Sequence, residues 1–143
     1  MSMVISSLAC VALLAISLAH FMWAFGRPWP IQNRRLLART VIGTPDVDKM
    51  PPWYALLALA ILTFVAAVLV LALADPDGGG AWLTAIGAVI GLVFLGRGIA
   101  GYVPAWQLKT PEEPFRTNDF RVYSPMCLLL GAGFLALVIM RLL

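Results

Sequence analysis

The side chains of this sequence that could bind a ligand or take part in a reaction lie in three short stretches, far apart along the chain. One stretch ends the first long apolar run, one lies late in the third, and one leads into the fourth. The candidate ligand-binding residues are His20, Trp23, Arg97, Asp119, Tyr123 and Cys127. A few polar groups that converge in an otherwise apolar cleft can fix the orientation of a small ligand. The sequence therefore predicts a ligand site, and an enzyme that uses His20 or Cys127 is a weaker alternative.

Several kinds of chemistry are excluded by residues that the sequence lacks. The chain has a single histidine, which excludes a multi-histidine metal site and bis-histidine haem ligation. Neither cysteine belongs to a C-x-x-C motif, and there is no glycine-rich phosphate loop or catalytic dyad. We therefore expect no metal and no cofactor, and whether the protein is an enzyme stays open.

Four long apolar stretches must position the candidate residues. They span residues 3–25, 53–74, 81–102 and 125–143, and about 20 apolar residues in a helix cross the ~30 Å hydrocarbon core of a bilayer. Hydrophobic residues make up 62% of the chain and charged residues 12%, against about 45–50% and 25% in soluble domains. The sequence therefore predicts an all-α integral membrane bundle of four transmembrane helices, with residues 1–143 forming a single domain. No acidic residue lies within any of the four stretches, which argues against a proton-coupled transporter.

Basic residues are concentrated in two of the loops. Loops 26–52 and 103–124 carry every lysine and arginine except Arg97 and Arg141, and the short loop 75–80 carries none. Because basic loops are retained in the cytoplasm, we expect both termini outside and both long loops in the cytoplasm. The expected partners are membrane lipids rather than nucleic acid, since no basic stripe carries interleaved aromatic residues.

Proline and serine mark where the helices are expected to begin. Pro52 precedes the second stretch, and proline is tolerated in the first turn of a helix but not in its interior. Ser124 followed by Pro125 predicts an N-cap at the start of the fourth helix. Residues 32–41 could form a short interfacial helix, whereas we expect the proline-rich loop 103–124 to be irregular.

Small residues on two of the helices predict close helix packing. Gly87, Gly91 and Gly98 form one stripe on the third helix, where another backbone can come close. The stripe could join helices within one chain or between chains. A homo-oligomer, or a structural subunit that docks onto a partner membrane protein, is therefore the alternative to a ligand-binding protein. On the first helix, Ser6 and Ser17 lie on nearly one line and mark the side that meets other helices.

Arg97 points away from the glycine stripe and needs a separate explanation. A guanidinium within a membrane helix either snorkels to the interface or faces inward and pairs with an acid, because its desolvation is costly. In the second case we expect Arg97 to lie within ~4 Å of Asp119 or to hydrogen-bond to His20.

Three motifs of the chain resemble those of a family of small bacterial membrane proteins described as domain of unknown function 3995. The resemblance covers nearly the whole chain and rests on residues 20–26 (HFMWAFG), 94–101 (FLGRGIAG) and 120–127 (FRVYSPMC). The family pattern has His-x-x-Trp-x-x-Gly at the end of the first helix, an arginine late in the third, and an aspartate, here Asp119, ahead of Tyr-Ser-Pro-x-Cys. Gly98 stands where the pattern is expected to have a small residue. The resemblance implies no activity, but it emphasises the same candidate residues.

These observations together define the expected function. We expect a small protein of the bacterial cytoplasmic (inner) membrane that binds a small or lipid-like ligand. The ligand would lie in a polar pocket at the cytoplasmic membrane face, where the candidate residues meet.

Overall fold

The computed structural model describes residues 1–143, and its secondary structure is entirely helical. The elements in chain order are α1 (Ser2–Ala24), α2 (Arg34–Val41), α3 (Trp53–Ala72), α4 (Gly80–Ala100), α5 (Pro104–Lys109), α6 (Phe115–Asn118), the π-helical turn η1 (Asp119–Tyr123) and α7 (Ser124–Leu142). Four helices are long and apolar enough to cross a membrane: α1, α3, α4 and the continuous helix that ends with α7. The all-α fold class with four membrane helices is therefore confirmed, and the chain is built as a multi-pass membrane protein.

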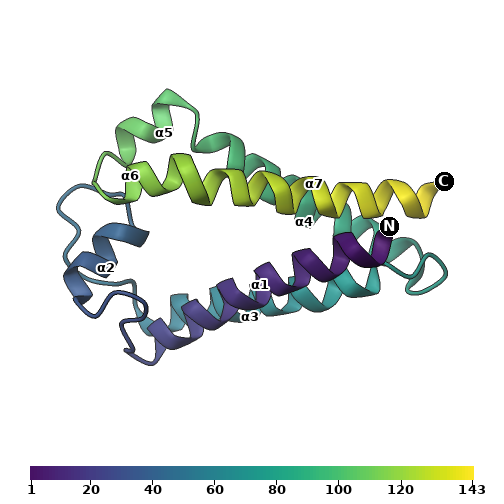
Figure 1. Ribbon diagram of the computed structural model, residues 1–143, viewed down its shortest axis with the longest axis horizontal. Coiled ribbons are helices and arrows are strands. Elements are labelled where there is room, and N and C mark those ends of the chain that lie inside the picture. The colour runs from purple at the N-terminus through teal and green to yellow at the C-terminus, as the bar shows by residue number, and fades with distance from the viewer.

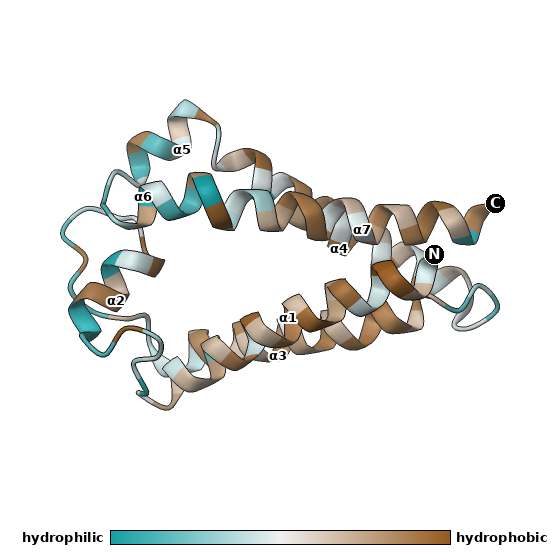
Figure 2. Ribbon diagram, in the orientation of Figure 1, coloured by the Kyte–Doolittle hydropathy of each residue, from teal (hydrophilic) through white to brown (hydrophobic).

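The long helices form two antiparallel pairs, α1 with α3 and α4 with α7 (Figure 1). The pairs lie close at the end that holds both termini and diverge toward the opposite end, where α2, α5 and α6 lie (Figure 1). We call these the termini end and the loop end. Hydrophobic residues dominate the long helices, and hydrophilic residues gather at the loop end (Figure 2). Which side of a membrane each end faces, and the single-domain organisation, stay predictions.

The core lies along the contacts within and between the two pairs. Leu13, Val70, Phe134 and Leu137 are completely buried there. Helix α1 is apolar on nearly every face, so its apolar residues do not distinguish the face that packs. The buried serines of α1 identify the face that packs, because the Ser17 hydroxyl donates to the Ala60 carbonyl of α3 at 2.7 Å. The sequence-based prediction that small polar residues mark the contacting face of this helix is therefore confirmed.

The glycine stripe of α4 packs against α7 of the same chain. A Cβ added at Gly91 would lie 3.1 Å from the Phe134 Cβ, and one at Gly98 would lie 2.9 Å from the Leu128 backbone nitrogen. Gly87 is buried as well. Within the chain, α7 therefore lies against Gly91 and Gly98 of the stripe.

The third loop corrects two expectations. It is not irregular, because residues 103–124 form α5, α6 and η1. Ser124 is not an N-cap, since its φ of −67° and ψ of −48° are helical and the helix runs through it from Phe115 to Leu142. Pro125 has no N–H to donate to the carbonyl four residues earlier, and the chain widens into a π-turn just before it, where the Ser124 N–H donates to the Asp119 carbonyl.

The other two local predictions are confirmed. Helix α2 (Arg34–Val41) lies within residues 32–41, and the Asn33 side chain caps it by accepting from the backbone N–H groups of Arg35 and Leu36. Helix α3 begins at Trp53, directly after Pro52. Backbone and side-chain contacts then join the two long loops: the Glu112 N–H donates to the Gly43 carbonyl at 3.3 Å.

Candidate functional site

The candidate residues fall into two groups at the loop end. Arg97, Asp119, Tyr123 and Cys127 belong to the α4–α7 pair, and His20 and Trp23 end α1. No hydrogen bond or ion pair joins the two groups. The structure therefore brings four of the six side chains to one helix pair and two to the other, and a ligand site formed by all six stays a prediction. The sequence places each residue at the correct end of its helix but does not say how far the two helix pairs diverge there.

The first group is built on a buried ion pair. Arg97 Nη2 lies 2.7 Å from Asp119 Oδ1, and the side chain of Asp119 is only 5% exposed. The expected pairing of Arg97 with Asp119 is confirmed. The Trp106 indole N–H donates to Asp119 Oδ2 at 3.0 Å, and the Arg97 guanidinium carbon lies 5.1 Å from the centre of the Trp106 ring. Trp106 is a member of the group that the sequence reasoning missed.

Two backbone features allow this close approach. The π-turn η1 brings the side chains at both of its ends together, and the Ser124 hydroxyl donates to Asp119 Oδ1 at 3.3 Å. Gly101 follows α4, and a Cβ there would lie 2.9 Å from the Ser124 Cβ and 3.2 Å from Asp119 Oδ2. Gly101 continues the stripe three residues after Gly98, and that spacing is the signal that could have identified it.

The chemistry of the first group is that of a structural cross-link. Both carboxylate oxygens of Asp119 accept hydrogen bonds, and Arg97 neutralises its charge. The carboxylate is therefore fully hydrogen-bonded, whereas Arg97 Nη1 is buried without a hydrogen-bond partner. The cluster ties the end of α4 and the middle of α5 to η1 and the start of α7.

Tyr123 and Cys127 do not contribute free polar groups to a shared cavity in the way that a ligand site requires. The Tyr123 hydroxyl donates to the Thr40 carbonyl of α2 at 3.0 Å, so it joins the two long loops. Cys127 is a half-buried free thiol that makes no hydrogen bond. Neither side chain is arranged with a base that would activate it as a nucleophile.

The second group surrounds the end of α1. The His20 Nδ1–H donates to the Ile16 carbonyl at 2.8 Å, and its ring centre lies 5.0 Å from that of Trp23. The Trp23 indole N–H donates to the Trp29 carbonyl at 2.5 Å. Gly26, with a φ of +71°, reverses the chain after the helix, a conformation that glycine adopts without steric cost. Trp23 and Gly26 both line a cavity next to this turn.

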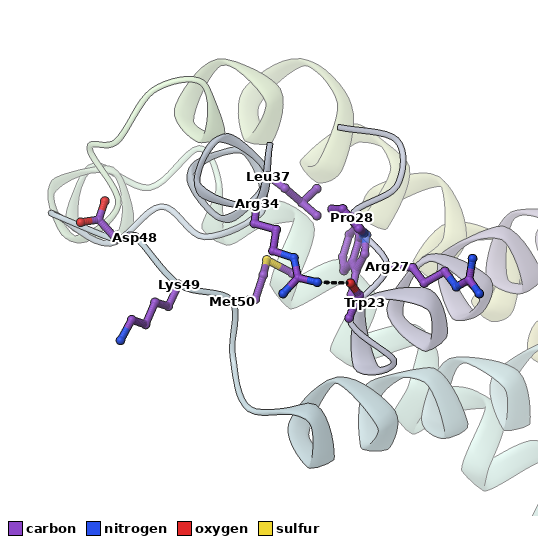
Figure 3. A pocket seen from close by; sticks show the side chains of 9 residues that line it. Trp23, Arg27, Pro28, Arg34, Leu37, Asp48, Lys49 and Met50 are labelled. Carbon is purple, nitrogen blue, oxygen red and sulfur yellow. Dashed lines mark hydrogen bonds between the residues drawn. The ribbon is translucent and has the colours of Figure 1, made fainter. Parts of the chain in front are cut away.

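This cavity, which we call the basic pocket, has a volume of about 280 Å³ (Figure 3). It is lined by Trp23, Gly26, Arg27, Pro28, Arg34, Leu37, Asp48, Lys49 and Met50. Figure 3 shows Arg34 reaching toward Trp23, with Arg27 and Lys49 on opposite sides of it. Arg34 Nη2 donates to the Gly26 carbonyl at 2.8 Å, which holds α2 against the end of α1.

The electrostatics of the basic pocket are unbalanced. Arg27, Arg34 and Lys49 form no ion pair. The one acid of the lining, Asp48, is already bound, because its Oδ1 lies 2.6 Å from Arg35 Nε. Sequence reasoning used these bases only to orient the chain and missed them as site residues. The pocket therefore combines uncompensated positive charge with an apolar wall of Trp23, Pro28, Leu37 and Met50.

Comparison with known proteins agrees with the resemblance carried by the three motifs. No curated protein and no solved structure is significantly similar to the chain. The sequence model of one family, described as Protein of unknown function (DUF3995), matches residues 13–134. That range includes every candidate residue of both groups, and the chain belongs to this family.

Proposed function

We propose that this is a small protein of the bacterial inner membrane that binds an anionic small or lipid-like ligand in the basic pocket, with the loop end facing the cytoplasm. The observation that carries the proposal is the set of three unpaired bases around a partly apolar cavity of about 280 Å³. A guanidinium is suited to a phosphate or carboxylate group, and aromatic and aliphatic walls suit the apolar part of an amphiphile.

The experiment compares the species that stay bound to the purified protein in native mass spectrometry. The wild type is expected to retain an anionic species. Arg34→Gln should lower its occupancy about tenfold, because a charge-assisted hydrogen bond contributes about 1.5–3 kcal/mol. Lys109→Gln is the matched control, since Lys109 is an exposed base of α5 outside the pocket. Equal occupancy in the wild type and Arg34→Gln would overturn the proposal.

The orientation is tested separately by reporter fusions. A reporter at Gly79, in the turn at the termini end, should respond outside the cytoplasm, and one at Arg35 should respond inside. The physical reason is the concentration of bases in the two long loops. A cytoplasmic response at Gly79 would place the basic pocket on the wrong side of the membrane.

The two alternative functions have less support. Docking onto a partner through the glycine stripe would require α7 to leave it, because Gly91 and Gly98 already contact that helix. An enzyme that uses His20 or Cys127 has less support, because the His20 Nδ1–H donates to the Ile16 carbonyl of its own helix and the Cys127 thiol makes no hydrogen bond to a base. The ligand-binding proposal needs no rearrangement of the chain.

A further inference from the structure

We infer that the ligand is an anionic phospholipid, with its phosphate at Arg27 and Arg34 and one acyl chain in an apolar groove between α1 and α3. The inference rests on the proposed function and goes beyond it, because it names the ligand class and adds a second part to the site. Three observations carry it: the groove itself, its connection to the basic pocket, and the charge at the point where they meet.

The groove has a volume of about 530 Å³ and lies on the half of the α1–α3 pair nearest the loop end. Its lining is Leu14, Ser17, Leu18 and Phe21 of α1 and Leu57, Ala60, Ile61 and Phe64 of α3. On each helix these residues are three and four apart, so they form two facing stripes. From Phe21 to Leu14 the groove runs about 10 Å along the helix, against about 15 Å for one leaflet of the hydrocarbon core.

Aromatic rings connect this groove to the charged region. The ring centres of Phe21, in the groove, and Phe25 are 4.7 Å apart. Phe25 lines a second cavity of about 450 Å³ together with Arg27 and Trp29. This cavity shares Gly26, Arg27 and Pro28 with the basic pocket. The groove, the second cavity and the basic pocket therefore follow one another from the apolar depth of the helices to their polar end.

The charge at the junction selects an anionic lipid. Arg27 lines both cavities, is exposed and has no acidic partner. The rings beside it, Phe25 and Trp29, are 66% and 51% exposed, as expected for aromatic residues at a membrane interface. A soluble anion would use the bases alone, whereas a phospholipid uses the bases, the interfacial rings and the groove together. Basic pockets at the ends of membrane helices are suited to anionic headgroups.

The test measures lipid retention by native mass spectrometry after purified protein is loaded from mixed micelles of phosphatidylglycerol and phosphatidylcholine. We expect the wild type to retain phosphatidylglycerol at least fivefold over phosphatidylcholine. Arg27→Gln should remove this preference, because it deletes the charge that both cavities share. Leu18→Trp should lower retention of phosphatidylglycerol at least threefold by filling the groove, and Ile61→Trp should do the same from the facing helix.

Matched controls separate a specific site from the general lipid coat. Lys109→Gln removes a base elsewhere at the loop end. Leu59→Trp adds the same bulk six residues from the loop end of α3, as Leu18 is six residues from that end of α1. Both should leave phosphatidylglycerol retention unchanged, and circular dichroism should show the same helicity in every variant.

The outcomes distinguish this inference from the proposed function. Equal retention of the two lipids, or equal losses in Leu59→Trp and Leu18→Trp, would overturn the lipid assignment. If that happens while inorganic phosphate still binds the wild type and is lost in Arg34→Gln, the basic pocket binds a soluble anion and the proposed function survives. If neither lipid nor phosphate responds to Arg27→Gln or Arg34→Gln, both proposals fail.

Discussion

The Arg97–Asp119 cluster and the basic pocket both lie at the loop end and contain similar residue types. They differ in whether their charged side chains have a partner of opposite charge. In the Arg97–Asp119 cluster the carboxylate is 5% exposed and both of its oxygens accept hydrogen bonds. In the basic pocket, Arg27 and Lys49 are exposed and have no acidic partner. A charge that is buried with its partner stabilises one arrangement of helices, whereas a charge left unpaired beside an apolar cavity is available to a ligand. Polar residues near a membrane face are therefore distinguished by their partners rather than by their type.

The largest effect is expected where the cluster loses one of its charges. Asp119→Ala leaves the Arg97 guanidinium without its partner and should cost about 3 kcal/mol, the lower end for a buried pair because Arg97 is 31% exposed. Arg97→Ala should cost a similar amount, and the double variant little more than either. Unfolding in detergent followed by circular dichroism measures all three. Additive losses would show that the two residues do not interact.

A smaller loss of stability is expected when a side chain is added at Gly101, where the end of α4 lies close to Ser124. Gly101→Ala should destabilise the protein by about 1–3 kcal/mol, because the new Cβ would lie 2.9 Å from the Ser124 Cβ. Gly96→Ala is the control in α4, since no atom lies within 4 Å of its added Cβ. It should be neutral or stabilising by about 0.5–1 kcal/mol, as alanine favours the helix. The same unfolding measurement compares them, and equal effects would contradict the steric argument.

The next largest loss of stability is expected when the hydrogen bond between the two long loops is removed. Tyr123→Phe removes the hydroxyl that donates to the Thr40 carbonyl and should cost about 1 kcal/mol. Tyr54→Phe is a suitable control, because Tyr54 is 63% exposed. Hydrogen exchange at the amides of α2 should accelerate in Tyr123→Phe alone. Unchanged exchange would mean that α2 is held by other contacts.

The smallest stability change is expected in the basic pocket. Arg27→Gln should alter the free energy of unfolding by less than about 0.5 kcal/mol, because Arg27 has no partner to lose. Measured without ligand, this variant should unfold like the wild type. A loss comparable to that of Asp119→Ala would show that the basic pocket is structural and would remove the contrast between the two groups.

The sequence by itself determined the membrane helices and several of their contacts. Twenty consecutive apolar residues are a local signal, so α1, α3, α4 and α7 lie close to where the composition predicts them. The glycine stripe on α4 and the partner of Arg97 were also predictable. Small residues mark close helix approach, and an arginine removed from water needs an acid within reach.

Only the tertiary structure decided how the candidate residues are divided. The helix pairs diverge at the loop end, which separates His20 and Trp23 from Arg97 and Asp119, and α2 of one long loop contacts α6 of the other there (Figure 1). Such contacts join residues far apart in the chain and leave no periodic pattern in the sequence. The basic residues of the pocket could not be predicted from the sequence either. The composition gives the number of basic residues but does not show which of them lack an acidic partner. Whether a charged residue has a partner depends on three-dimensional packing, and this is what distinguishes the Arg97–Asp119 cluster from the basic pocket.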